Sequence, residues 1–167
     1  MDTYLERLQE AVASATRGMS DEELTRHPVG KWSAAEVLEH LYLTYRGTVK
    51  GLERCLQGGK PLARTRTMRD RVRSSVVVGL GHMPKGRKSP ERAMPRGMPA
   101  REVNAAIEPQ IRTMAELMSR CEAQFGKRTR ILDHPVLGPL TAREWCKFHW
   151  VHGRHHVKQI WELRGRN

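Results

Sequence analysis

Apolar residues recur along most of this chain at the three-to-four-residue spacing of a helix that buries one face. Four stretches show this spacing, at residues 3–17, 34–56, 101–124 and 141–163. No stretch alternates apolar and polar residues for long enough to predict a sheet. Because four amphipathic helices can bury their stripes against one another, the pattern predicts an all-α protein built as a four-helix bundle.

The predicted helix starts carry a common signal. A Ser or Thr followed three residues later by Glu forms a capping box, in which each side chain accepts a hydrogen bond from the other residue's backbone. This pattern occurs at Ser20–Glu23, Ser33–Glu36 and Thr141–Glu144. It predicts a short helix after Ser20 and the starts of two long helices.

Two features complicate the second half of the pattern. Pro109 falls inside the third long helix, so we expect it to kink that helix or to mark its true start near Glu108. Residues 126–140, which contain HPVLGPL, are predicted to be an irregular connector to the last helix.

Positive charge is concentrated in one segment. The formal net charge is +12, and residues 60–101 contain twelve Lys and Arg against only Asp70 and Glu91. Within this segment residues 66–80 have helical potential, and VVVGL at 76–80 is expected to pack on the body. Gly and Pro in residues 81–99 exclude a regular element there. The segment is therefore predicted to be a long basic excursion between the second and third long helices.

The basic excursion has three interpretations. We favour a solvated loop, and next a basic entrance that attracts an anionic substrate to a site on the bundle. Nucleic-acid binding is disfavoured, because residues 60–101 contain no aromatic side chains on which bases could stack.

The length of 167 residues suits one domain, spanning residues 1–167 with 60–100 as an insertion. No apolar run approaches the roughly 20 residues that cross a membrane, and the acidic N-terminus lacks the apolar centre of a signal peptide. We therefore expect a cytoplasmic protein. Its cysteines are far apart and predicted to be reduced residues on helices: Cys55, Cys121 and Cys146.

Half of the eight histidines fall within FHWVHGRHHVKQ, residues 148–159 of the last predicted helix. A helix turns by about 100° per residue, so His149, His152 and His156 share one face, and His155 lies at its edge. That face also carries large apolar side chains, which make it the core-facing one: Trp145, Phe148 and Leu163.

Two of these histidines have the spacing of metal ligands. His152 and His156 stand one turn apart, as two ligands of one ion require. A third ligand must come from another helix, and His40 in the stripe of the second long helix is the candidate. The alternative is a hydrogen-bonded core cluster, since buried imidazoles need partners of some kind. His149 is either a fourth ligand, a group behind the ligands or a proton relay.

Other side chains near the predicted site are expected to have structural roles. Glu36 completes a capping box, Tyr45 packs in the core, and Glu39 and Glu144 are solvated. Three histidines lie in predicted loops and are not assigned to the site: His27, His82 and His134.

Three passages taken together resemble a known family. They are KWSAAEVLEHL at 31–41, HPVLGPLTAREW at 134–145 and FHWVHGRHHVKQ at 148–159. In this order they are similar to the DinB-like superfamily of small helical proteins, in particular its branch of uncharacterised bacterial proteins with an HPxxGPLT connector. The resemblance covers most of the chain from about residue 20 and is weakest across residues 60–100.

The resemblance implies a four-helix bundle with a metal site formed by His40, His152 and His156. Gln159 matches the glutamine that follows the histidine pair, and we place it with His149 behind the ligands. In this family the ion is typically divalent, such as zinc or nickel, although ligand softness alone also suits copper and iron. Some members use a low-molecular-weight thiol as cosubstrate, and homodimers are expected.

Two functions remain open. One is a metal-dependent enzyme that acts on a small substrate, for which an anion is one candidate. Such an enzyme would be a thiol-dependent transferase or isomerase, or a hydrolase. The other is a non-catalytic stress-response or binding protein with a structural or vestigial metal site, whose basic segment docks on an acidic partner.

Overall fold

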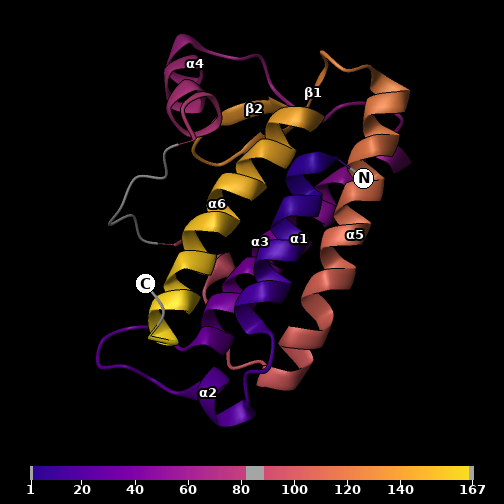
Figure 1. Cartoon of the computed structure of the whole chain (residues 1–167). Helices are drawn as coiled ribbons and strands as arrows, with labels where there is room; N and C mark the ends of the chain where they lie inside the picture. Colours follow the sequence, from indigo (N-terminus) through magenta and orange to yellow (C-terminus); the bar gives the residue numbers. More distant parts are fainter. Residues whose placement is uncertain (1, 82–88, 166–167) are drawn as a thin grey trace.

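The computed structural model describes residues 2–81 and 89–165, in which four long helices run alongside one another (Figure 1). This arrangement confirms the predicted all-α class. The long helices are α1 (Thr3–Thr16), α3 (Ala34–Gln57), α5 (Ala100–Phe125) and α6 (Ala142–Leu163).

The core lies between these four helices. Each contributes side chains that are fully withdrawn from solvent, among them Leu8, Leu41, Met114 and Ile160. Burying one such side chain stabilises the fold by about 1.5–3 kcal/mol. The apolar stripes seen in the sequence are therefore the faces that hold the bundle together.

Capping boxes fix the helix starts as predicted. Both hydrogen bonds of the box are present at the starts of α2 (Asp21–Thr25), α3 and α6. A further box that we did not predict, Thr67 with Asp70, begins α4 (Met68–Ser74).

Pro109 lies inside α5, which begins at Ala100, so the expected start near Glu108 is wrong. A proline removes one backbone donor and strains one turn. Val103 and Ile107 before it and Ile111 after it are all buried in the core. The burial of these side chains on both sides of Pro109 outweighs the local cost, and the helix continues.

The predicted irregular connector forms a short hairpin instead. Strand β1 (Arg130–His134) pairs antiparallel with β2 (Gly138–Thr141), with a register irregularity between Arg130 and Leu132. Ile131 and Leu140 are fully buried beneath it. Each strand has only four or five residues, too few for an alternating pattern to stand out in the sequence.

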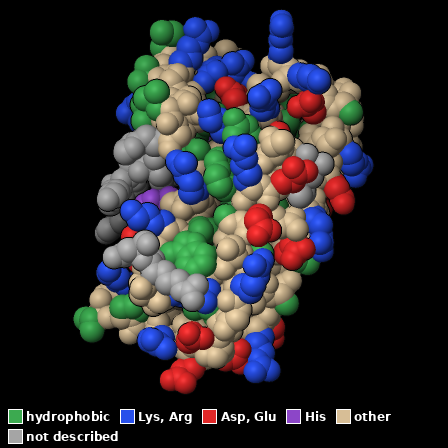
Figure 2. All heavy atoms as spheres, viewed as in Figure 1, with side chains coloured by type: hydrophobic (Ala, Val, Ile, Leu, Met, Phe, Trp, Pro, Cys, Tyr) green, Lys and Arg blue, Asp and Glu red, His purple; other side chains and the backbone are tan. Residues whose placement is uncertain are grey.

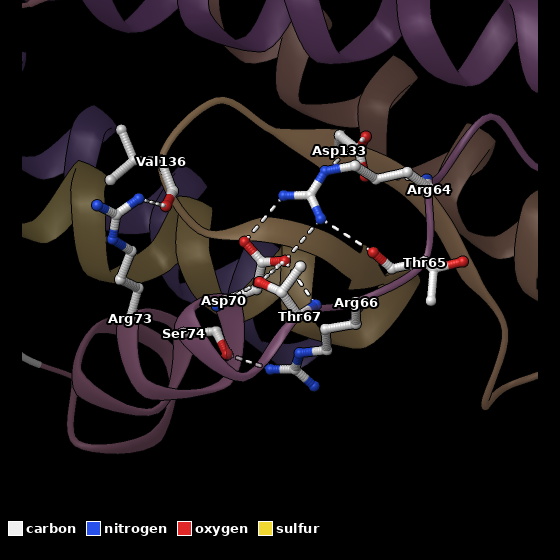
Figure 3. A network of polar contacts seen from close by, with 9 residues as sticks. All are labelled: Arg64, Thr65, Arg66, Thr67, Asp70, Arg73, Ser74, Asp133 and Val136. Atoms are coloured by element: carbon white, nitrogen blue, oxygen red, sulfur yellow. Dashed lines mark hydrogen bonds and ion pairs between the residues drawn. The ribbon is translucent and has the colours of Figure 1, made fainter.

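The start of the basic segment is docked on this hairpin, although many of its side chains, Arg64 among them, are exposed to solvent. Arg64 makes two hydrogen bonds to the buried carboxylate of Asp70, at 2.7 and 2.9 Å, and approaches Asp133 of β1 (Figure 3). These contacts hold the pKa of Asp70 well below its ordinary value, mainly through the hydrogen bonds from Arg64. Arg73 donates to the Val136 carbonyl at 3.5 Å.

Described residues further along the segment also contact the body. Val77 and Val78, in the π-helical stretch η1 (Ser75–Gly79), are buried, as expected for VVVGL. After the undescribed residues, a 3-10 turn, η2 (Glu91–Ala93), leads into α5. Within the described ranges, no helix is both long enough and apolar enough to cross a membrane.

Candidate metal centre

Three histidines from two helices converge in the bundle. His40 comes from α3, and His152 and His156 come from successive turns of α6. The Nε2 atom of His152 lies 3.2 Å from Nε2 of His40 and 3.1 Å from Nε2 of His156. One ring nitrogen from each residue lies within 4.8 Å of the others.

This spacing fits a shared metal ion. Nitrogen ligands bind zinc at about 2.0–2.1 Å, so two of them at a tetrahedral angle lie about 3.3 Å apart. The two Nε2–Nε2 distances at His152, 3.2 and 3.1 Å, are close to that value. Two of the three separations thus match those of ligands that share one ion, and the ring nitrogens of His40 and His156 lie within 4.8 Å of each other.

Hydrogen bonds on the far side of two rings fix where their protons lie. His40 Nδ1 is 2.8 Å from the Ala93 carbonyl oxygen, and His156 Nδ1 is 2.7 Å from Gln159 Oε1. Both oxygens only accept hydrogen bonds, so each Nδ1 carries a proton and each Nε2 presents a lone pair. Nε2 of His152 therefore faces the lone pairs on Nε2 of His40 and of His156. A proton on His152 Nε2 can form a hydrogen bond with only one of them.

The electrostatic surroundings keep these rings neutral. Burial lowers the pKa of His40, and the hydrogen bond to Ala93 opposes that shift in part. Burial, followed by electrostatic coupling to the neighbouring His40 ring, lowers the pKa of His156 to about 3. Burial likewise holds the pKa of His152 well below its ordinary value. Neutral imidazoles are the form that binds metals.

Aromatic rings pack against the three-histidine cluster on two sides. Phe148 stacks on His152, with ring centroids 5.5 Å apart and an interplanar angle of 9°. Trp32 lies against His40 at 5.3 Å. His155, expected at the edge of the face, is half-buried with its ring 5.2 Å from that of His156. An apolar wall limits solvent access and fixes ring orientation.

His149 lies one turn before His152 but does not join the cluster formed by the described residues. Its Nε2 is 3.2 Å from Thr48 Oγ1, and that hydroxyl donates onward to the Thr44 carbonyl. His149 Nε2 therefore carries the proton. Full burial, followed by the charge of His134, lowers the pKa of His149 to about 3. The structure places it beneath the site, in contact with Tyr45.

Glu39 was expected to be solvated, and that expectation is wrong. Its side chain is only 4% exposed, and its carboxylate accepts hydrogen bonds from three consecutive backbone N–H groups, those of Arg96, Gly97 and Met98. A buried carboxylate needs such donors. They lie 57 to 59 residues away, so no local sequence signal identified them.

The other histidines stand apart from the cluster. His134 is on β1, where its Nδ1 accepts from the backbone N–H groups of Val136 and Leu137 at 3.1 Å. His27 Nε2 lies 3.2 Å from Oε2 of the capping residue Glu36. His82 lies outside the described residues.

Positive charge from the basic segment reaches the neighbourhood of the site. Arg92 is exposed and adjoins Ala93, whose carbonyl holds His40. Its charge contributes to the lowered pKa of His134. In Figure 2 histidine atoms reach the surface next to Lys and Arg side chains.

The donor set defines the chemistry that the centre can support. Three neutral nitrogens leave the full charge of a divalent ion uncompensated and at least one coordination position open. Structural zinc sites are usually closed by four protein ligands, and open ones are catalytic. The residues present therefore fit a centre with an open coordination position.

Comparisons with known proteins agree with this architecture. A family model described as the DinB superfamily matches residues 4–160. The uncharacterized protein YuaE of Bacillus subtilis is 24% identical over 157 residues, which cover 89% of this chain and 87% of that protein. No solved structure matches. The family match covers the three converging histidines and most or all of each of the four long helices.

Proposed function

Because the chain belongs to the DinB superfamily, we propose that it is an enzyme that binds one divalent metal ion through His40, His152 and His156. The observation that carries the proposal is the convergence of the Nε2 atoms at 3.1 and 3.2 Å. Two of the three rings are already held with Nδ1 protonated and Nε2 free. The open coordination position supports a catalytic role over a structural one.

We propose thiol-dependent transfer or isomerisation as the reaction class, with hydrolysis as the main alternative. A divalent ion such as zinc or nickel, held by His40, His152 and His156, would act as a Lewis acid and lower the pKa of a thiol or a water in its open position. The first case leads to transfer of a small thiol and the second to hydrolysis.

The chain's own side chains supply binding and orientation. Ala93 and Gln159 hold protons on the outer nitrogens of two ligands, and Phe148 and Trp32 exclude water from two sides. The exposed Arg92 attracts an anionic substrate or thiol toward the site. Free buried cysteines support a reducing, cytoplasmic setting: Cys55, Cys121 and Cys146.

Metal content tests the site directly. Untagged wild-type protein, reconstituted with zinc or nickel and dialysed, is expected to retain about one ion per chain by plasma mass spectrometry. His152→Ala is expected to lose it, because the central Nε2 is removed. His27→Ala, outside the cluster, is the matched control. A wild-type protein that retained no ion would end the proposal.

Turnover tests the reaction class. We expect the zinc-loaded or nickel-loaded protein to consume a low-molecular-weight thiol together with an electrophilic substrate, and His152→Ala to show no such activity. Consumption of an ester or amide without thiol would favour hydrolysis. If the metal-loaded protein shows neither activity, the binding role described in the next paragraph remains.

A second candidate function rests on the surface of α4. Large apolar side chains are exposed there among arginines, with Met68 71% and Val72 64% exposed. In this alternative the protein is a non-catalytic stress-response or binding protein with a structural or vestigial metal site, whose basic segment docks on an acidic partner. Binding of an acidic peptide that weakens as salt rises, and is lost in Arg69→Glu, would support it.

We also propose that residues 1–167 form a single domain and that the protein is a homodimer. Light scattering coupled to gel filtration measures the dimer, expected at twice the chain mass of 19.2 kDa. A monomer at all concentrations would remove the dimer and leave the metal site unaffected.

A further inference from the structure

A short stretch of backbone crosses α3 beside the metal centre. We call residues 93–98 the strap. It begins at Ala93, the last residue of η2, and precedes α5. At one end the Ala93 carbonyl accepts from His40 Nδ1 at 2.8 Å. At the other end three backbone N–H groups donate to Glu39.

Two consecutive residues of α3 therefore hold the two ends of the strap through hydrogen bonds. Glu39 and His40 project about 100° apart around the helix, so their side chains reach different parts of the same crossing segment. The carboxylate takes Arg96 N at 2.8 Å on Oε1, and Gly97 N at 3.1 Å and Met98 N at 3.0 Å on Oε2.

The chemistry of this contact requires a carboxylate. Three converging donors need an acceptor-only group with two oxygens, which an ionised Glu provides. Hydrogen bonds to an ionised acceptor are roughly twice as strong as neutral ones. Gly97 has φ +86°, a left-handed conformation that lets successive N–H groups turn toward one anion.

Resting on the proposed metal site, we propose that Glu39 is a positioning residue for its first ligand. By holding the strap, Glu39 holds the Ala93 carbonyl where it accepts the Nδ1 proton of His40. That hydrogen bond selects the tautomer whose Nε2 is free to bind the ion. Glu39 thus acts on the ion through Ala93 and His40 and does not contact it.

The packing of α3 separates this role from a general structural one. Leu38 and Leu41, which flank Glu39 and His40, are fully buried in the bundle core. The helix start is held independently by Ser33 and Glu36. Loss of the Glu39 contact is therefore expected to release the strap and leave α3 in place.

The first experiment reads the tautomer of His40 without any metal. Protein labelled with nitrogen-15 in its histidine rings reports, by NMR, which ring nitrogen carries the proton. We expect wild-type His40 to carry it on Nδ1, and Glu39→Gln to show a mixture of tautomers. The amide is nearly the same shape but offers one acceptor oxygen and places an NH₂ against a donor.

The second experiment measures zinc affinity by competition with a coloured chelator. We expect Glu39→Gln to bind zinc 10-fold to 100-fold more weakly than wild type, the usual effect of losing a group that orients a ligand. Glu53→Gln, the same change at an exposed site on α3, is the matched control and should keep wild-type affinity. Circular dichroism checks that each variant is folded.

A second variant reaches the strap without altering α3. Gly97→Ala strains the backbone at φ +86° while its added Cβ meets no atom within 4 Å. It should weaken zinc binding and disturb the His40 tautomer in the same direction as Glu39→Gln. This variant decides the question if Glu39→Gln does not fold.

Two outcomes are distinguishable. If wild type binds zinc and both strap variants keep its affinity and its His40 tautomer, the positioning role is overturned while the metal site stands. If wild type binds no zinc, the proposed metal site is lost, and the tautomer spectra still decide whether Glu39 orients His40.

Discussion

At the scale of single residues, the metal centre depends on where protons sit. Each outer ring has its Nδ1 proton accepted by an oxygen, from Ala93 for His40 and from Gln159 for His156. His152 Nδ1 is buried and has no such partner among the described residues. Two of the three ligands are therefore pre-oriented, and the third is oriented by packing against Phe148.

Replacement of Gln159 tests this orientation. Gln159→Leu removes the acceptor for His156 Nδ1, so the ring can turn or take the other tautomer, and we expect zinc affinity to fall 10-fold to 100-fold. Gln159→Glu keeps an acceptor and should retain most of the affinity. Isothermal titration with zinc makes the comparison, and equal affinities in the two variants would contradict the role.

His134 carries a second residue-level consequence, a dependence of stability on pH. Burial, with a smaller contribution from the charge of Arg92, lowers the pKa of His134 from 6.5 to about 4. As pH falls, His134 therefore binds a proton near pH 6.5 in the unfolded chain but only near pH 4 in the folded chain. This part of the stability is full above pH 6.5 and is lost as pH falls toward 4.

His134→Asn should remove that contribution. The Asn oxygen can accept from Val136 and Leu137 in place of Nδ1 but does not take up a proton. Between pH 7 and pH 4.5 we expect wild type to lose about 2 kcal/mol more unfolding free energy than the variant. Urea denaturation at the two pH values measures the difference, and parallel losses would contradict it.

At the scale of elements, the hairpin and α4 form one unit. Gly138 of β2 has φ +75°, and a Cβ there would lie 2.4 Å from Asp70 Cγ and 2.5 Å from its Oδ1. Asp70 in turn holds Arg64 and caps α4 through Thr67. The close approach at Gly138 therefore joins the basic segment to the hairpin.

Gly138→Ala is expected to break this junction. Left-handed backbone costs a non-glycine residue about 1 kcal/mol, and the clash with Asp70 adds about 1–3 kcal/mol more. Gly59→Ala, at φ +65° with no atom within 4 Å, incurs the backbone cost alone. Chemical denaturation should thus show the first variant to be clearly less stable than the second.

The elements that sequence reasoning found differ physically from those that it missed. The long helices and their caps depend on residues three or four positions apart, which the sequence displays directly. The strands of the hairpin are too short to show a period. The Arg64–Asp70 contact and the strap depend on residue pairs whose spacing follows no local sequence pattern. His40, His152 and His156 were found because they lie on apolar stripes of predicted helices; Glu39 was missed because its donors are backbone groups.

At the scale of the whole molecule, a bound ion would join α3 to α6, elements whose ligands are 112 residues apart. A ligand that binds only the folded chain stabilises it by mass action, by about 2.7 kcal/mol at one hundred times Kd. For a chain of this size that corresponds to a rise in Tm of about 5–10 °C.

Thermal unfolding in rising zinc concentrations measures this effect. We expect the Tm of wild type to climb with zinc, and that of His152→Ala to stay constant. Since zinc also binds unfolded histidines, the increase should be smaller than mass action alone allows. An increase of equal size in both proteins would place the ion elsewhere.

The separation of the ligands along the chain also determines when the site can form during synthesis. His40 is made early, whereas His152, His156 and Gln159 lie in the last helix of the chain. A nascent chain therefore carries one ligand and no site until α6 has emerged from the ribosome. Binding of an ion at the proposed site would therefore have to follow the emergence of α6, and a chain that stopped before α6 would lack His152 and His156.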